Sequence, residues 1–379
     1  LEAYRGLGAW VDLFEGRAWR RPARAVADMA AHGVRTLYLE TSNHSQARAI
    51  RDPSGVARFI EAAHDRGIEV VAWYLPGFDR LRRDLVRSMR AVNFRTPGGE
   101  AFDSFALDIE ASIVDPPSKR IRRLLKLSRR IRARVGPDYP LGAVIPSPFR
   151  MERGSSWRNF PYAELNQIYD VFLPMAYFTF HVGGEARVHD EVAASIPVIR
   201  EGTGDPTVPI HVIGGIANQA SGPEVRGFVH AVREHGALGA SLYNWSLTRE
   251  PDWAELRHIP VNPRQSPALP VALPWSDELG YLPGGDRTHP AEVFFAAGPL
   301  PGARTLTFEA FDVQPGEVQI LVNWQPVGTV AAGGSWSAPQ AVPIPDEALR
   351  DGKPNVIGFM SSAVHPDWTE WGVRSVSIG

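Results

Sequence analysis

The feature that most constrains the fold is an eightfold alternation of short apolar runs with amphipathic segments between residue 6 and about residue 257. An apolar run that is followed by a helix-like segment is typical of a parallel strand that helices cover. Eight such units predict an α/β fold, the (β/α)8 TIM barrel. The predicted strands are 6–13, 34–41, 68–75, 104–111, 141–146, 171–178, 208–215 and 237–246.

The segments between these runs have helical periodicity, and several end in a glycine just before the next strand. A glycine there supplies the left-handed residue that ends a helix. The predicted helices include 23–32, 55–66, 119–135, 190–200 and 223–235, and the glycines are Gly33, Gly67, Gly136 and Gly236. A doubly wound open sheet is the alternative, but no Gly-rich phosphate loop follows the first strand, as its nucleotide-binding versions need.

The length of the chain and a change in its residue pattern predict two domains. A chain of 379 residues is long for one core. A proline-rich stretch follows the last barrel unit, and the chain after it alternates strands and turns without helical periods. We therefore predict a barrel over 1–258, a linker over 259–273 and a smaller β-sandwich over 274–379.

The composition restricts the class of partner. The net charge is −2, so nothing draws the chain to nucleic acid or to anionic lipid, and no apolar run reaches the ~20 residues of a membrane span. Cysteine is absent, which excludes disulfides, thiolate catalysis and cysteine-bound metals. The chain starts at Leu1 rather than at Met, and we expect a removed leader and a secreted, extracellular protein.

The fourth predicted strand ends in two carboxylates, Asp108 and Glu110. Alternate residues of a strand share a face, so both acids point the same way, while Leu107 and Ile109 point into packing. Two acids that repel each other and lose water shift one pKa upward, which suits a general acid near neutral pH. The alternative is a solvated strand end with a carboxylate that caps a helix.

Other chemistry-bearing residues lie at the predicted carboxyl ends of the strands, where (β/α)8 barrels place their sites. A mouth lined by carboxylates and aromatic rings suits a sugar, because rings stack on its C–H faces and carboxylates bind its hydroxyls. The predicted substrate-binding residues are Trp10, Asp12, Glu40, Tyr74 (or its neighbour Trp73), Met175, Tyr177, Tyr243 and Trp245.

Some of these residues also fit structural roles. Met175 and Trp10 suit core packing, and Asp12 and Glu40 suit helix capping. The histidines lack the spacing of metal ligands, and no Gly-x-Ser-x-Gly elbow follows a strand. We therefore predict neither a metal in the barrel nor a cofactor, and we leave open a structural metal in the β-sandwich, bound by Asp and backbone oxygens.

Three short motifs resemble the chitinase-like family, glycoside hydrolase family 18 and its relatives. That family carries Asp-Gly-x-Asp-x-Asp-x-Glu on strand 4, and Asp103, Asp108 and Glu110 match its first acid, its third acid and its Glu. Met175-Ala-Tyr177 is similar to the strand 6 signature Met-x-Tyr-Asp.

The resemblance implies a role for each matched residue. Glu110 would be the acid/base, Asp108 its partner, and Tyr177 a hydrogen-bond donor near the reacting centre. Trp245 resembles the strand 8 tryptophan that lies under the sugar. In that family the N-acetyl group of the substrate is the nucleophile.

The chain also departs from the family pattern. Ser104 replaces the motif glycine, Ala106 replaces the middle Asp, and Phe178 stands where the strand 6 Asp is expected. These losses weaken the case for chitin, so we interpret the barrel as an outlying member. If a second catalytic carboxylate is needed, Asp12 and Glu40 are the candidates.

Three functional hypotheses follow. The first is a glycoside hydrolase acting on a polysaccharide or oligosaccharide, with amino sugars among its candidate units. The second is a non-catalytic glycan-binding protein on the same barrel, motivated by the two missing acids. A deacetylase or lyase is the third, and it would need a metal or a lysine base that the sequence does not offer. The predicted β-sandwich resembles the accessory β-domains of secreted carbohydrate-active enzymes.

Overall fold

The computed structural model describes residues 1–151, 157–259, 271–276, 279–281, 292–298, 304–323, 325–349, 355–361 and 371–379. The chain divides into two compact units. The first comprises 1–203, 208–232 and 237–262, and the second comprises 204–207, 233–236 and 263–379. Each unit is described by itself.

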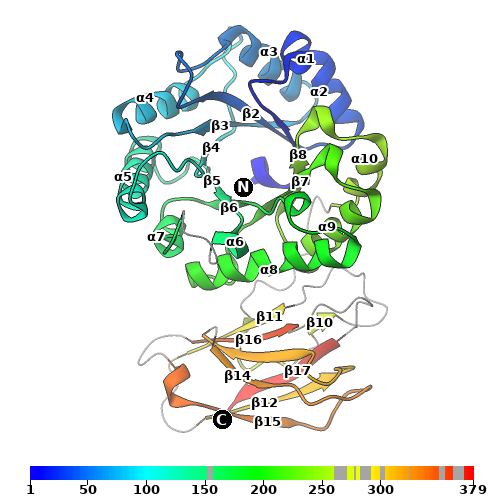
Figure 1. Ribbon diagram of the computed structural model, residues 1–379. Helices are drawn as coiled ribbons and strands as arrows, with labels where there is room; N and C mark the ends of the chain where they lie inside the picture. Colours follow the sequence, from blue (N-terminus) through cyan, green and yellow to red (C-terminus); the bar gives the residue numbers. More distant parts are fainter. Residues whose placement is uncertain are drawn as a thin grey trace. The chain divides into compact units, whose positions relative to one another are not determined.

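The first unit contains a closed barrel of eight parallel strands in the order β1 to β8, which confirms the predicted barrel (Figure 1). The last strand pairs with the first, with Gly6 opposite Gly239 and Gly8 opposite Ser241. The strands are β1 (Gly6–Val11), β2 (Thr36–Asn43), β3 (Glu69–Leu75), β4 (Ser104–Asp108), β5 (Leu141–Pro146), β6 (Val171–Met175), β7 (His211–Ile216) and β8 (Gly239–Tyr243).

Helices follow the strands and form the outer ring of the barrel (Figure 1). Glycines end several of them as predicted, and Gly33 and Gly136 have φ of 81° and 82°. The helices are α1 (Gly16–Arg20), α2 (Pro22–Ala31), α3 (Pro53–His64), α4 (Leu81–Val92), α5 (Pro117–Val135), α6 (Pro148–Met151), α7 (Tyr162–Asn166), α8 (Glu185–Thr203), α9 (Gly222–Glu234) and α10 (Glu250–Leu256). The 3-10 turns are η1 (Glu2–Tyr4), η2 (Phe178–Phe180), η3 (Ala217–Gln219), η4 (Trp245–Leu247) and η5 (Asp346–Ala348).

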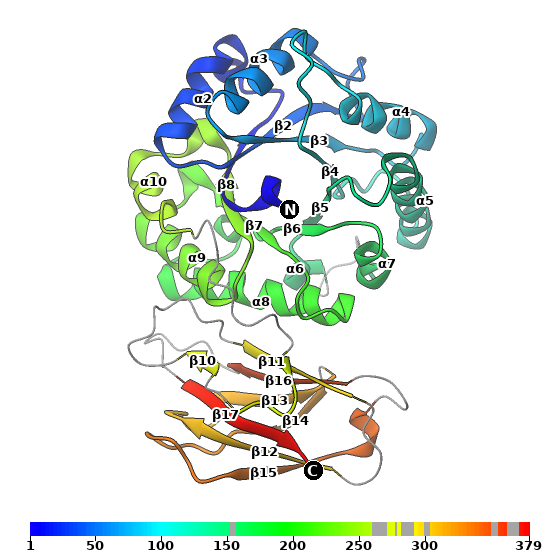
Figure 2. The same ribbon diagram turned by 180° about the vertical axis from the view of Figure 1, so that it is seen from behind.

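The N-terminal segment lies in the strand-start end of the barrel. Figure 2, seen from behind, places η1 in the centre of the ring of strands. Ala3 and Tyr4 belong to the interior core, and the Tyr4 hydroxyl lies 2.6 Å from Ser104 Oγ. This plug leaves the opposite end of the barrel, where the strands end, as the open mouth.

Two apolar layers result from strands that are buried on both faces. An outer layer between strands and helices includes Leu37, Leu107 and Phe228. A separate interior cluster includes Trp10 and Val71. Residues that alternate along one strand therefore pack into different layers, and only the inner set can reach the mouth.

The second unit contains two sheets that share one core. One sheet has the order β10-β17-β12-β15, and the other has the order β14-β13-β16-β11-β9. Phe308 of one sheet contacts Phe359 of the other with ring centroids 4.9 Å apart. The strands are β9 (Val271–Ala272), β10 (Leu279–Tyr281), β11 (Glu292–Ala297), β12 (Arg304–Phe311), β13 (Val318–Val322), β14 (Gln325–Thr329), β15 (Gln340–Ile344), β16 (Asn355–Ser361) and β17 (Trp371–Ile378). These two sheets form the separate all-β region that the sequence predicts.

One strand of the second unit falls inside the predicted linker. β9 pairs in parallel with β11, so pairing begins at Val271, before the predicted boundary at residue 274. A strand of two residues is too short to show alternation in the sequence. Residues 260–270 of the predicted linker lie outside the described residues.

In the part of the chain that the structure describes, no helix has the length and apolarity needed to cross a bilayer.

Candidate active site

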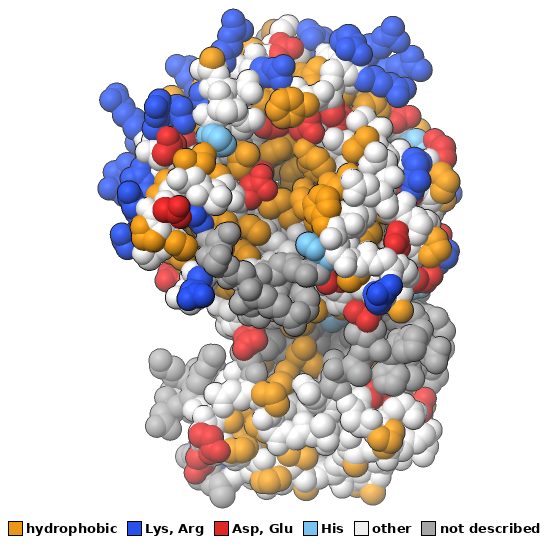
Figure 3. Space-filling model, viewed as in Figure 1, with side chains coloured by type: hydrophobic (Ala, Val, Ile, Leu, Met, Phe, Trp, Pro, Cys, Tyr) orange, Lys and Arg blue, Asp and Glu red, His pale blue; other side chains and the backbone are white. Residues whose placement is uncertain are grey.

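Figure 3 looks into the mouth and shows a hollow at the centre of the barrel, with acidic side chains among hydrophobic ones. Asp108 is the last residue of β4 and is buried, with 6 % of its surface exposed. Glu110 follows two residues later, beyond the strand, and its side chain is exposed. One acid is therefore held inside the protein and the other reaches solvent at the mouth.

The protein surroundings favour the protonated forms of this pair. Burial raises the pKa of Asp108 well above its usual range, and repulsion from Glu110 and Glu40 adds to the shift. Loss of water within the mouth raises the pKa of Glu110 as well. Asp108 Oδ1 is buried and has no hydrogen-bond partner among the described residues. Because two interacting acids titrate together, the pair retains a proton at higher pH than a free carboxylate would.

Glu40 is the third acid of this group and lies near the end of β2. Its Oε2 accepts a hydrogen bond from the Leu13 amide at 3.0 Å, and its Oε1 accepts one from Asn43 Nδ2 at 3.0 Å. Burial raises the pKa of Glu40 to about 7, and these hydrogen bonds oppose the shift. Glu40 therefore fixes the loop after β1 and also places a titratable group beside Asp108.

Asp12 joins the first and last strands at the mouth. Asp12 Oδ2 accepts hydrogen bonds from the Tyr243 hydroxyl at 2.7 Å and from Asn244 Nδ2 at 3.1 Å. Asp12 Oδ1 accepts a bond from the Phe14 amide at 2.7 Å. These bonds satisfy the carboxylate within the protein, so Asp12 positions Tyr243.

Tyr177 stands between β6 and η2 and faces the acids. Its ring makes an edge contact with Tyr243 at 6.2 Å between centroids. Burial raises the pKa of Tyr177, and the negative charges of Asp108 and Glu110 raise it further. The Tyr177 hydroxyl consequently keeps its proton and is available as a hydrogen-bond donor beside the carboxylates.

Glu15 is an acid near the mouth that the sequence does not single out. It precedes α1, is 7 % exposed, and its pKa is raised to about 8 by burial and by repulsion from Asp12. The strand period ends before this loop, so alternation cannot predict its direction. The only feature of the sequence that could have indicated Glu15 as a site residue is its position three residues after Asp12.

A chain of hydrogen bonds crosses the floor below the mouth. Trp10 Nε1 donates to Ser241 Oγ at 2.7 Å, and Ser241 Oγ lies 3.0 Å from His211 Nε2. His211 Nδ1 lies 2.9 Å from the carbonyl oxygen of Tyr4, so Nδ1 must donate and Nε2 must accept. Burial lowers the pKa of His211 to about 4, which keeps the ring neutral.

Trp10 and Met175 form part of this floor and contribute little surface to the mouth. Trp10 is 2 % exposed and stacks on Tyr38 with centroids 4.2 Å apart. Met175 is 6 % exposed within the same interior cluster. Both residues support the site from below.

The prediction that Tyr74 faces the mouth is wrong, and Trp73 faces it instead. Tyr74 packs in the outer layer, and its hydroxyl donates to Asp84 Oδ1 at 2.8 Å. Trp73 belongs to the interior cluster, and its buried Nε1–H has no partner among the described residues. The adjacent aromatic residues lie on opposite faces of β3, which a fully buried strand does not reveal in its sequence.

The prediction that Trp245 lies under the sugar is also wrong. β8 ends at Tyr243, and Trp245 begins η4, so the alternation does not extend to it. Trp245 packs in the outer layer, and its Nε1 donates to Asp28 Oδ2 of α2 at 2.9 Å. Tyr243 is the residue of β8 that reaches the mouth.

The remaining motif positions have structural explanations. Asp103 lies at the opposite end of β4, where Oδ2 accepts a bond from the Val70 amide at 2.7 Å. Ala106 pairs with Trp73 on β3, and both lie in the interior cluster. Phe178 packs against Phe228 in the outer layer, with centroids 5.9 Å apart. Among the described residues, no group of three or more His, Asp or Glu side chains could hold a metal ion.

Comparison with known proteins supports the fold. No protein-family model and no curated protein matches the sequence. The endo-beta-1,4-mannanase from Thermotoga petrophila is similar in structure, with a TM-score of 0.53 and 11 % identity over 99 % of this chain and 98 % of that chain. A GH18 chitinase from Pseudoalteromonas aurantia has a TM-score of 0.50 and 13 % identity over 67 % of this chain and 98 % of that chain. At these identities the likeness concerns the fold alone.

Proposed function

We propose that the chain is a glycoside hydrolase that cleaves a polysaccharide, with Glu110 as the general acid/base and Asp108 as its partner. The observation that carries this proposal is the asymmetric pair at the mouth. Asp108 is buried, with an Oδ1 that has no hydrogen-bond partner in the described part of the chain, and Glu110 is exposed. The fold neighbours include glycan-cleaving enzymes, which agrees with the proposal.

In the proposed reaction Glu110 protonates the glycosidic oxygen as the bond to the anomeric carbon breaks. Asp108 cannot reach bulk water, so its negative charge is costly and the pair holds a proton that Glu110 can deliver. The same Glu110, once deprotonated, accepts a proton from the incoming water. Both steps need an acid whose pKa is near the working pH.

The walls of the mouth offer what a sugar ring requires. Tyr177 and Tyr243 present aromatic rings at an edge contact, and sugars stack on such rings through their C–H faces. Trp73 Nε1–H is a buried donor that has no partner among the described residues, so a sugar hydroxyl or carbonyl can accept its hydrogen bond. We therefore assign Trp73 to the substrate-binding residues in place of Tyr74.

The second catalytic group depends on the sugar. An N-acetyl group of the substrate would serve as nucleophile in the chitinase-like scheme, but Ala106 lacks the carboxylate that this family has there. A sugar without that group would need a second carboxylate from the protein. Glu40 is closest in chemistry to that role, because its pKa of about 7 places it near the working range and it faces Asp108.

Non-catalytic glycan binding on the same barrel is the second candidate. The observation that favours it is the apolar character of two positions, Ala106 and Phe178, at which the chitinase-like family has acids. The presence of Glu110 at the mouth opposes it, because binding alone has no need for a carboxylate with a raised pKa.

The proposal is tested by the release of reducing sugar from a polysaccharide panel by the parent chain and by Glu110→Gln. The panel spans chitin, peptidoglycan, galactosaminogalactan, and α- and β-glucans. Gln preserves size and cannot donate a proton, so activity should fall by about a hundredfold or more. Glu164→Gln, an exposed residue of α7, is the matched control and should retain the parent rate.

Two outcomes would contradict the hydrolase proposal. Equal rates for the parent and Glu110→Gln would remove Glu110 from the reaction. Saturable binding of a glycan by both proteins, without release of sugar, would establish the binding protein instead. A polymeric substrate is encountered outside the cell, so we also propose that the protein is secreted, and its absence from the medium of the producing cells would refute this.

A further inference from the structure

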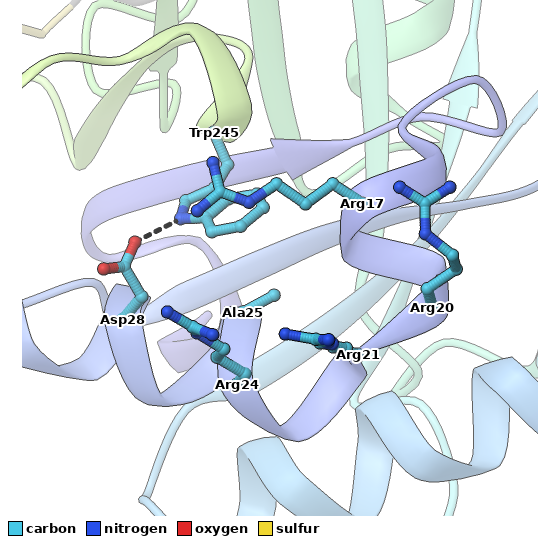
Figure 4. Close-up of a pocket in the computed structure, with 7 residues that line it drawn as sticks. All are labelled: Arg17, Arg20, Arg21, Arg24, Ala25, Asp28 and Trp245. Atoms are coloured by element: carbon cyan, nitrogen blue, oxygen red, sulfur yellow. Dashed lines mark hydrogen bonds between the residues drawn. The ribbon is translucent and has the colours of Figure 1, made fainter.

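An arginine-lined cavity lies on the outside of the barrel and takes no part in the proposed reaction. It has a volume of about 310 Å³. Its lining, which we call the arginine pocket, consists of Arg17, Arg20, Arg21, Arg24, Ala25, Asp28 and Trp245. Figure 4 shows Arg17 and Arg20 on the α1 side, Arg21 and Arg24 at the start of α2, and the Trp245 indole across from them.

The charge of the pocket is not neutralised by its surroundings. All four arginines are exposed, and in the described part of the chain none of them pairs with a carboxylate. Asp28 is the one acid in the lining, and its Oδ2 already accepts the hydrogen bond from Trp245 Nε1 at 2.9 Å. The four positive charges repel one another, and the single negative charge offsets only part of this repulsion. A bound anion would offset more of it.

The backbone holds these arginines around the cavity. Arg21 lies between α1 and α2 with φ of −139°, outside the helical range, so the two short helices meet there at an angle. Buried Ala18 and Ala25 fix the helices to the barrel. Trp245, with 8 % of its surface exposed, forms a rigid wall. The backbone positions that carry the four arginines are therefore set by packed elements.

The pocket lies beside the side of the mouth where β1 and β8 meet. Trp245 follows Tyr243 and Asn244, which both bond to Asp12, and Arg17 follows Glu15 by two residues. The pocket and the mouth therefore share the segments that follow β1 and β8.

We propose that the arginine pocket binds a tetrahedral oxyanion, phosphate or sulfate, carried as an ester on the glycan. Guanidinium groups form paired hydrogen bonds to such oxyanions, and several of them around one cavity can bond the three terminal oxygens of a phosphate or sulfate ester, whereas a carboxylate offers only two. The cavity is large enough for the ester group and part of its sugar. Only the attachment to a glycan rests on the proposed hydrolase function; the binding of the oxyanion does not.

The first test is calorimetric titration with inorganic phosphate and with sulfate at low ionic strength, with acetate as the comparison anion. We expect saturable binding of one phosphate or sulfate per chain, weakened about tenfold or more in R21Q/R24Q. The matched control is R129Q/R130Q, which removes two exposed arginines of α5 and should change the affinity by less than about twofold. R21K/R24K keeps the charge but loses the paired geometry, so it should bind more weakly than the parent and more tightly than R21Q/R24Q.

The second test uses N-acetylglucosamine 6-phosphate, its 6-sulfate and the unsubstituted sugar, each titrated into Glu110→Gln. This variant measures binding without hydrolysis, so failure of the hydrolase proposal does not affect the result. We expect a preference of about tenfold for one of the charged sugars, lost when R21Q/R24Q is added. The sugar that is preferred identifies phosphate or sulfate as the group.

Several results would overturn the inference. These are the absence of saturable phosphate and sulfate binding by the parent, equal weakening in R21Q/R24Q and R129Q/R130Q, and equal affinity for charged and uncharged sugars. Circular dichroism and the Tm of each variant separate a loss of binding from a loss of folding.

Discussion

The Tyr243 hydroxyl donates a 2.7 Å hydrogen bond to Asp12 Oδ2, and this bond joins the last strand of the barrel to the first at the mouth. Asn244 donates to the same oxygen at 3.1 Å. The bond orients the Tyr243 ring, which then meets Tyr177 across the mouth. The closure of the barrel and the aromatic wall of the site thus depend on one carboxylate.

Tyr243→Phe should lower the free energy of unfolding by about 1–3 kcal/mol, because it removes a bond to a charged and largely buried acceptor. Denaturant unfolding measures this change. Tyr177→Phe is the matched control, since in the described part of the chain the Tyr177 hydroxyl makes no hydrogen bond to protein. Equal losses in the two variants would show that the Asp12 bond contributes nothing specific.

The two tryptophans of the interior should separate binding from stability. Trp73→Phe removes an Nε1–H that has no partner among the residues that the structure describes. Glycan affinity should therefore fall about fivefold or more, which corresponds to the loss of one hydrogen bond. Trp10→Phe removes the bond to Ser241 and should cost about 1 kcal/mol more in stability than Trp73→Phe. Isothermal titration and thermal unfolding of both variants provide the comparison. Weaker binding in Trp10→Phe than in Trp73→Phe would contradict the assignment.

Glu15 should make the stability of the barrel depend on pH. Its pKa in the folded state is raised to about 8, so the folded chain holds a proton that the unfolded chain releases near pH 4.5. The contribution is therefore complete below pH 4.5 and is lost as the pH rises toward 8. At pH 9 Glu15→Gln should be more stable than the parent, by at most about 5 kcal/mol, and at pH 4 the two should be alike.

Thermal unfolding across this pH range measures the effect. Glu164→Gln makes the same chemical change at an exposed acid, so its stability should depend on pH as that of the parent does. A Glu15→Gln curve that runs parallel to the parent at every pH would show that Glu15 is not held protonated in the folded state.

Local patterns in the sequence were sufficient to predict the barrel. β5 spans Leu141–Pro146 as predicted, and β3 begins one residue later than predicted, because a buried strand between glycine-ended helices has clear limits. Within the predicted β-sandwich, β12 has the alternating burial of a half-buried strand, with Leu306 and Phe308 buried. The prediction of a fold class combines many weak sequence signals that agree, so an error in one strand or helix does not change the predicted class.

Individual site residues were harder to predict, because each depends on where one strand stops or which face one side chain takes. Trp245 lies two residues past Tyr243, but β8 has ended and η4 turns the indole toward α2. Tyr74 and Trp73 are equally apolar neighbours in a strand that is buried on both faces. Glu15 lies in a loop, to which no period applies. In each of these cases the packing of the folded protein, and not the local sequence pattern, determines where the side chain lies.

The pH dependence of kcat/KM for the parent and for Asp108→Asn tests the central claim most directly. The claim is that Asp108 and Glu110 share a proton at the mouth, because burial raises the pKa of both acids and repulsion from Glu110 raises that of Asp108 further. Asp108→Asn leaves Glu110 to titrate alone, and the alkaline limb of the profile should move to lower pH with a reduced maximum. An alkaline limb that stays where it is in the parent would contradict the account, because Glu110 would then titrate independently of Asp108.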